Sequence, residues 1–192
     1  MKRSLIFIAL LASTGAMADS TVPVTDNASI LNSGAQYSGN IGVNQAAGDQ
    51  SQQTNARVIA IGKNASASTR VNQNINTPAN SRMNATASIS GNAFSNGSGV
   101  LGVNQSAGAN NQMANVMRIS VSTGPQSIDD SVLSQQNVTP STSSGATDAS
   151  NGSRQVTTSD QAFTGSRGVI QVNQSAGVGN QIANTLSIRV AN

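Results

Sequence analysis

Residues 42–48 read Gly-Val-Asn-Gln-Ala-Ala-Gly, and nearly the same seven residues return at 102–108 and at 171–177. In each copy a Gln follows four residues after the closing Gly, and an Asn follows three residues after that Gln. The second interval between copies is longer than the first, so a unit of constant length is joined by linkers of different length. This pattern predicts a protein built from three similar structural units.

Alternating side chains downstream of each block indicate strands. In the third copy the apolar residues Ile182, Leu186 and Val190 share one face of an extended chain, and the polar residues share the other. The block itself alternates in the same way, and Gly with small polar residues separates the two halves. We therefore predict an all-β fold in which each repeat is a strand–turn–strand arch of about 35 residues.

The repeats and the segments between them differ in composition. All four prolines lie outside the repeats, as hydrogen-bonded strands inside them would require, and the linkers are rich in Ser, Thr, Asn and Gly and are expected to be flexible. The predicted organisation is a signal peptide at 1–18, an N-terminal segment at 19–27, repeats at 28–62, 85–122 and 156–192, and linkers at 63–84 and 123–155.

One arch cannot bury its apolar face alone, so we expect the three repeats to stack as layers of a β-solenoid or cross-β arrangement. Stacking in register places identical amides above one another, where they can form hydrogen-bonded ladders. In a soluble solenoid the same amides would instead cap turns. The residues predicted to support self-assembly are Asn44, Gln45, Gln52, Asn55, Asn104, Gln105, Gln112, Asn115, Asn173, Gln174, Gln181 and Asn184.

Each repeat also contains one aromatic residue, followed by Ser or Thr and then by a Gly. These residues, Tyr37, Phe94 and Phe163, are predicted to be packing anchors. In this alignment the first copy lacks three residues between its aromatic residue and its Gly.

The ends of such a stack decide its behaviour. Val190, the last residue of the alternating pattern, is followed only by Ala191 and Asn192, and few charges are present to repel a partner. A stack with two complementary open edges should join head to tail and form filaments, because that contact does not close on itself.

Composition argues against an enzyme. The 192 residues include no Cys, His, Trp or Glu, only 9% are charged, and 39 are Asn or Gln. The usual general bases, thiolate nucleophiles and zinc ligands are therefore missing, and we expect no catalytic residue, no cofactor and no metal. The pair Asp129-Asp130 reads as a solvated loop, since no third ligand lies at calcium-binding spacing.

The amino terminus reads as a secretory signal peptide. Lys2 and Arg3 precede an apolar run at 5–12, and Ala16-Met17-Ala18 forms a cleavage site. Cleavage after Ala18 leaves eight Lys or Arg and seven Asp, a net charge of +1, so the basic composition does not indicate a nucleic-acid partner. No remaining apolar stretch is long enough for a membrane anchor.

The repeated block, with its downstream Gln and Asn in three copies behind a signal peptide, resembles the Fap-type functional amyloid subunits of Pseudomonas-like bacteria. The resemblance implies export through a dedicated outer-membrane pore and assembly, with itself and related subunits, into extracellular cell-surface fibrils that stiffen biofilm. The short linkers resemble those of the minor, nucleating subunit. Family members often carry Cys-x-x-Cys near the carboxyl terminus, which this chain lacks.

Two functions are consistent with these observations. The first is a fibril subunit of a biofilm matrix that grows by strand addition at an open edge and is held by Asn/Gln ladders. The alternative is a secreted, non-amyloid β-solenoid adhesin that binds a surface or glycan. A secreted enzyme is a third class, but its Asp residues recur at no common repeat position, and a Ser nucleophile would have no partner His.

Overall fold

The computed structural model describes residues 23–75, 82–124 and 152–191; the predicted signal peptide and the Asp129-Asp130 pair lie outside these ranges. The described residues form nine β-strands and no helix. The strands are β1 (Val24–Leu31), β2 (Ser38–Ala47), β3 (Gln52–Gly62), β4 (Met83–Ser90), β5 (Ser98–Ala107), β6 (Gln112–Ser122), β7 (Arg154–Thr158), β8 (Arg167–Ala176) and β9 (Gln181–Ala191).

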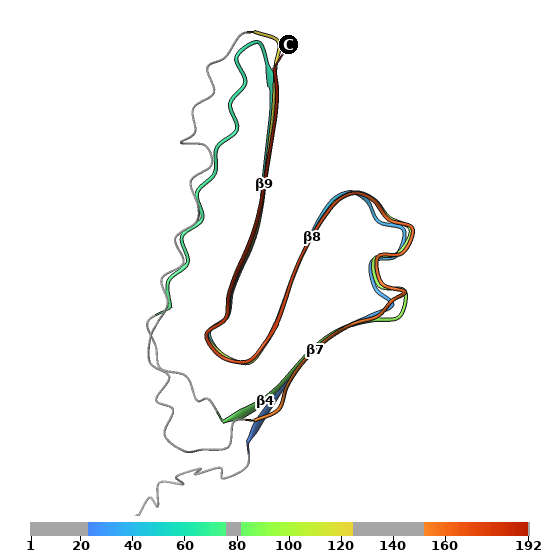
Figure 1. Ribbon diagram of the computed structural model, residues 1–192, viewed down its shortest axis with the longest axis vertical. Helices are drawn as coiled ribbons and strands as arrows, with labels where there is room; N and C mark the ends of the chain where they lie inside the picture. Colours follow the sequence, from blue (N-terminus) through green and yellow to red (C-terminus); the bar gives the residue numbers. More distant parts are fainter. Residues whose placement is uncertain (1–22, 76–81, 125–151, 192) are drawn as a thin grey trace, which may run out of the picture.

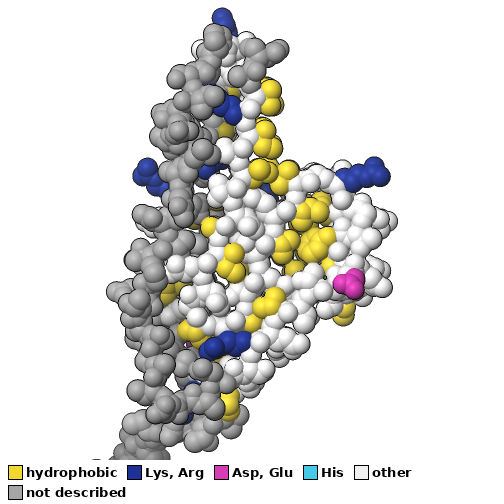
Figure 2. Space-filling model, viewed as in Figure 1, with side chains coloured by type: hydrophobic (Ala, Val, Ile, Leu, Met, Phe, Trp, Pro, Cys, Tyr) yellow, Lys and Arg dark blue, Asp and Glu magenta, His cyan; other side chains and the backbone are white. Residues whose placement is uncertain are grey.

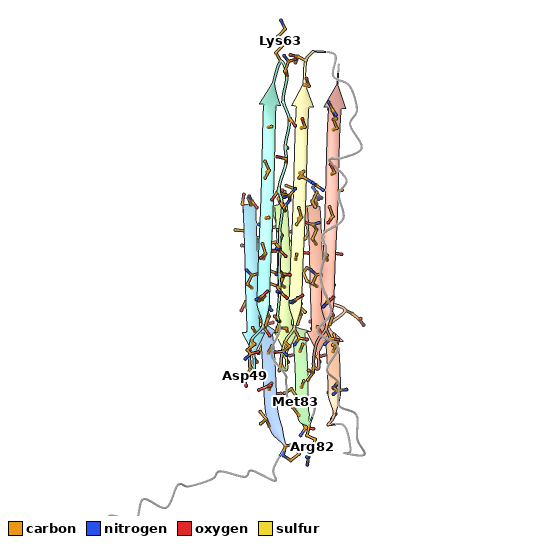
Figure 3. The ribbon with its side chains drawn as sticks, turned by 90° about the vertical axis from the view of Figure 1, so that its left-hand side faces the viewer. Asp49, Lys63, Arg82 and Met83 are labelled. Atoms are coloured by element: carbon orange, nitrogen blue, oxygen red, sulfur yellow. The ribbon has the colours of Figure 1, made fainter. Side chains whose placement is uncertain are left out.

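Three parallel sheets run through the molecule, and every repeat contributes one strand to each sheet. The first sheet has the order β1-β4-β7, the second β2-β5-β8 and the third β3-β6-β9. The three strands of one repeat therefore form a layer: layer 1 is β1–β3, layer 2 is β4–β6 and layer 3 is β7–β9. Seen down the stack, the layers follow the same serpentine course and overlie one another (Figure 1). Seen from the side, equivalent strands lie side by side (Figure 3). The predicted all-β, layered stack of repeats is confirmed.

The register of the sheets matches the sequence repeats residue for residue. In the second sheet Asn44 pairs with Asn104, which pairs with Asn173. In the third sheet Asn55 pairs with Asn115, which pairs with Asn184. The two unequal offsets between copies of the repeated block are therefore the offsets between layers.

Each layer contains one strand more than the arch predicted from the sequence. This additional strand is β1, β4 or β7; it precedes the arch, and the three copies of it form the first sheet. The predicted repeat boundaries at residues 28, 85 and 156 consequently fall inside these strands rather than before them. The three strands share few identical residues at paired positions, so a search for repeated blocks does not detect them.

The aromatic residues occupy two positions in the layers, not one. Ser38, Ser98 and Arg167 are paired, so Tyr37 corresponds to Gly97, and the backbone hydrogen bond from Phe94 N to Ser33 O aligns Phe94 with Gly34. The first repeat therefore has no gap. Its Tyr side chain lies over the space left by Gly97, where an added Cβ would come within 2.0 Å of the Tyr37 ring.

Apolar packing between the first and second sheets forms the core. Phe94 stacks on Phe163 with 5.5 Å between ring centroids, and Tyr37 belongs to the same cluster together with Ile30, Ile89, Leu101 and Val103. Alanines such as Ala85, Ala87 and Ala107 fill the narrower part of the same inter-sheet space. The aromatic residues thus lie in an apolar core that is continuous through all three layers.

The segment after β3 lies against the outer face of the third sheet, although it has almost no regular secondary structure. Ala67 and Ile75 are buried there, and the Gln73 side-chain amide donates to Met113 O at 3.0 Å. The Gln52 side chain donates to Asn74 O at 2.9 Å. The sequence predicted a linker in this region but not its packing against the sheet.

Candidate functional site

A ladder of Asn side chains fills the space between the second and third sheets. The Asn173 amide donates to Asn104 Oδ1, and the Asn104 amide donates to Asn44 Oδ1, both at 2.9 Å. Each donor also reaches a backbone carbonyl of the third sheet: Asn104 donates to Thr54 O and Asn173 to Ala114 O. Alternation along β2, β5 and β8 places these amides on the inner face, where an unpaired polar group would be costly.

A second Asn ladder faces the first from the third sheet. The Asn115 amide donates to Asn55 Oδ1 at 3.1 Å, and the Asn184 amide donates to Asn115 Oδ1 at 3.2 Å. Within layer 2, Asn115 also donates to Asn104 Oδ1 at 3.0 Å, and equivalent bonds join the two columns in the other layers. The two columns form one hydrogen-bonded network in which each side chain holds its neighbours in place.

A Gln ladder lies on the opposite face of the second sheet, toward the first sheet. The Gln174 amide donates to Gln105 Oε1 and the Gln105 amide to Gln45 Oε1, both at 2.8 Å. Backbone carbonyls of the first sheet accept the remaining protons, such as Ser88 O from Gln105 at 2.9 Å. The ladder thereby joins the first sheet to the second, next to the apolar core between these sheets.

The second predicted Gln column behaves differently from the first. Gln52, Gln112 and Gln181 are in register, but the Gln52 amide bonds to the adjoining segment at Asn74 O. The buried carbonyl of Gln112 has no hydrogen-bond partner among the described residues. Instead, the neighbouring turn holds a contact that the sequence analysis missed, from the Asn180 amide to Asn111 Oδ1 at 2.9 Å. The repeat search could not identify it, since layer 1 has Ser51 at that turn.

Arg57 explains the weaker alternation of the first repeat. It lies at the position of Met117 and Leu186, inside the space between the second and third sheets, and donates to Ile41 O at 2.7 Å. Gly102 leaves room for its guanidinium, since an added Cβ would lie 2.3 Å from Arg57 Nη2. Burial lowers the pKa of Arg57 from its ordinary value.

Glycine columns allow the layers to approach closely at the two ends of the second sheet. A Cβ on Gly99 would lie 2.1 Å from Gly39 O, and one on Gly168 would lie 2.0 Å from Gly99 O. At the other end, a Cβ on Gly108 would lie 2.1 Å from Gly177 O. These glycines also have positive φ angles, which other residues adopt only with strain. The close approach of neighbouring layers therefore excludes side chains here.

No strand in the described part of the chain pairs with the outer edges of layers 1 and 3, so both ends of the stack present open strand edges there. From Leu101 onward every residue of β5 is buried, whereas no residue of β2 is buried, and the later part of β8 alternates between buried and half-buried residues. The amide ladders are directional, because each NH2 group points toward layer 1 and each carbonyl toward layer 3. Layer 3 therefore ends in acceptors, and layer 1 ends in donors.

The described residues contain no cluster of three or more His, Cys, Asp or Glu side chains that could hold a metal ion. Neither do they contain a helix that is long and apolar enough to cross a membrane. Asp49 and Asp160 belong to different positions of their layers, so the structure does not bring them together.

Comparison with known proteins adds a relationship to this geometry. The chain matches the functional amyloid protein FapB/FapC family over residues 10–191. It is 44% identical over 118 residues to the functional amyloid subunit FapC of Pseudomonas aeruginosa, a match that covers 57% of this chain and only 34% of that relative's length. No solved structure matches the chain. The resemblance drawn from the repeated block is thus confirmed.

Proposed function

This chain belongs to the functional amyloid protein FapB/FapC family, and we propose on that premise that it is a secreted, self-assembling fibril subunit of an extracellular biofilm matrix with a role in adhesion. Its proposed partners are further copies of itself and related fibril subunits. The signal peptide predicted at 1–18 and a dedicated outer-membrane pore would provide the route of export.

The contrast between the middle and outer layers carries the proposal. Asn104 in layer 2 has hydrogen-bond partners from layers 1 and 3. The Asn44 amide in layer 1 donates, among the described residues, only to Gln53 O at the long distance of 3.4 Å. A further copy placed in register on either end would give the outer layers the environment that layer 2 already has. Each added copy would also satisfy the backbone groups of three open strands.

We infer that assembly proceeds by templated addition at these edges. The acceptors of layer 3, Asn173 Oδ1 and Asn184 Oδ1 among them, would receive the amide donors of layer 1 of the next copy. The same twelve Asn and Gln residues predicted from the sequence would then line a continuous fibre. In the Gln52 column the side chains would lie in register from layer to layer without forming an amide ladder. Growth of this kind is heterologous and has no closed end point.

Fibre diffraction of purified residues 19–192 tests the proposal. A fibril subunit should give fibres with one reflection near about 4.7 Å and another near about 10 Å. A protein that stays monomeric for days at high concentration, with a stable strand signature, would contradict the proposal and favour the non-amyloid adhesin. In that case the measurement to follow is binding to surfaces and glycans.

A further inference from the structure

The end layers carry opposite charges in one column of the first sheet. Asp26 in layer 1 pairs with Ala85 in layer 2, and Ala85 pairs with Arg154 in layer 3. Within one copy the small alanine separates the two charges. If the next copy continues the register, its layer 1 follows layer 3 directly, and its Asp26 lies next to Arg154 in the adjacent layer.

The Arg154 side chain extends in the direction of that next layer. A Cβ on Gly108 would point at Gly177 O, so the Cβ positions of this glycine column face from layer 1 toward layer 3. At Gly177 the corresponding position lies 2.9 Å from Arg154 Cδ and 3.1 Å from Arg154 Nε, and at Gly48 it lies 2.5 Å from Asp26 Oδ2. Both side chains therefore take the same place over the glycine of their own layer, so they stack in one column when a following copy continues the register. The Arg154 side chain therefore lies on the open side of layer 3 (the end seen in Figure 2), where a following copy would dock.

The charge of each whole layer has the same sign as these two residues. Strands and turns of layer 1, residues 24–62, contain Asp26, Asp49 and Arg57, a net charge of −1. Residues 152–191 of layer 3 contain three arginines and one aspartate, a net charge of +2. Asp49 lies at the β2–β3 turn on the layer 1 side of the stack (Figure 3). Head-to-tail contact joins opposite charges, whereas head-to-head and tail-to-tail contacts join like charges.

The surroundings of Asp26 in layer 1 disfavour its charged form. Burial, with a smaller contribution from the nearby Asp49 carboxylate, raises the pKa of Asp26 above its ordinary value of 3.8. An arginine arriving from another copy would relieve this repulsion. The acidic pair thus favours a basic surface on the partner that covers it.

We propose that Arg154 of one copy forms an ion pair with Asp26 of the next, supported by Asp49, and that this pair selects head-to-tail stacking of layer 3 on layer 1. The inference rests on the proposed fibril function and adds to it the polarity and register of the contact between subunits. The partner surface is a second copy of this chain.

Charge exchange in two separate variants tests the pair. Asp26→Arg brings two guanidinium groups together at every junction between identical copies, and Arg154→Asp brings two carboxylates together there. Each variant alone should elongate about tenfold more slowly than the unsubstituted protein, since attraction is exchanged for repulsion at a partly solvated pair. An equimolar mixture of the two should regain a large part of the rate. In the mixture each copy can choose a neighbour, and a junction that joins the unchanged Asp26 of one variant to the unchanged Arg154 of the other restores the original pair.

Arg167→Asp is the matched control for these variants. It makes the same change of charge in layer 3, but its column contains Ser38 and Ser98 rather than a carboxylate. We expect this variant to elongate at close to the rate of the unsubstituted protein.

The outcomes test the ion pair separately from the fibril function. Recovery in the mixture, with little effect of Arg167→Asp, supports the ion pair. Single variants that elongate at the normal rate, or a mixture that stays as slow as its components while the unsubstituted protein forms fibres, would overturn the ion pair and leave the fibril function standing. Failure of the unsubstituted protein to form fibres would overturn the proposed function and this inference with it.

Discussion

Replacing Gly39 by alanine should slow growth of the fibre strongly without a clash inside the subunit. A Cβ on Gly39 would meet nothing within 4 Å, because no layer precedes layer 1 among residues 23–75, 82–124 and 152–191. In a continuing stack it would face Gly168 O of the preceding copy, as Gly99 faces Gly39 O at 2.1 Å and Gly168 faces Gly99 O at 2.0 Å. Contacts this short do not persist, so the layers would have to separate locally, at a cost of about 1–3 kcal/mol.

Gly179→Ala is the matched control for this substitution. Gly179 also has a positive φ, 71° against 88° for Gly39, and its Cβ would likewise meet nothing within 4 Å. The equivalent positions in layers 1 and 2 hold Gln50 and Asn110 with positive φ, so this column already accepts side chains. The strain of a positive φ, about 1–2 kcal/mol, is therefore common to both variants and only Gly39→Ala adds the clash between copies.

Elongation from preformed, unsubstituted seeds, followed by a fibre-specific dye, measures the difference. The clash predicts that Gly39→Ala adds to seeds about 10- to 100-fold more slowly than Gly179→Ala, which is the kinetic equivalent of about 1–3 kcal/mol. Strand content of the fresh protein should be alike in the two variants. Equal elongation rates would show that the layer 1 edge does not contact layer 3 of another copy.

Three further predictions follow from the interior of the stack. Asn104→Ala should lower the stability of fibres in guanidinium by about 2–4 kcal/mol, because it removes the four hydrogen bonds of a fully buried side chain. The control variant Asn40→Ala, on the exposed face of β2, should have little effect. Asp26→Asn should stabilise the protein before fibre formation at neutral pH, as measured by urea denaturation. The pKa of Asp26 is raised in the folded protein, so ionisation of Asp26 opposes folding. The stability gained by Asp26→Asn should therefore disappear as the pH falls below about 3.8, the ordinary pKa, because Asp26 is then protonated in both the folded and the unfolded protein. If the two proteins still differed in stability at low pH, ionisation of Asp26 would not be the cause. Replacing residues 123–153 by a copy of residues 63–82 should leave fibre formation intact, because the first linker is the shorter of the two and already joins the end of one layer to the start of the next. Complete removal of the second linker should abolish the layered fold, since a chain needs about 11 extended residues to return along a strand as long as β6.

The repeated block predicted the second and third sheets well, because stacking in register demands identical amides and glycines at each layer. For this reason every copy has an Asn at the positions of Asn44 and Asn55, and the sequence alone predicted that these residues stack in columns. The first sheet escaped prediction, since its contacts require apolar residues on one face but not identical residues in every layer. Ala85 and Ala87 are fully buried in β4, yet a run such as Met-Asn-Ala-Thr-Ala-Ser-Ile-Ser is not obviously apolar. The alternation itself was the signal that could have revealed this strand.

The aromatic residues show where sequence alignment misleads. Tyr37 and Phe94 are each followed by Ser and then by a glycine, which suggested one position with a deletion in the first copy. The structure instead fills one volume from two backbone positions, with Tyr37 over Gly97 and Phe94 beside Gly34. Close packing of the core requires that this volume be filled, but not that the same backbone position fill it in every layer. Only the register of the strands could therefore show that Tyr37 and Phe94 occupy different positions and that the first copy has no deletion.

The axial rise per subunit in an image reconstruction of the fibre shows whether each chain contributes three layers to a head-to-tail stack. Three layers per chain, each separated by about 4.8 Å, predict that successive chains advance by about 14 Å along the fibre axis. The reconstruction should also place Asn173 of one chain next to Asn44 of the following chain. A rise of about 4.8 Å, with one layer per chain and each residue stacked on its own copy, would contradict head-to-tail stacking of three-layer subunits.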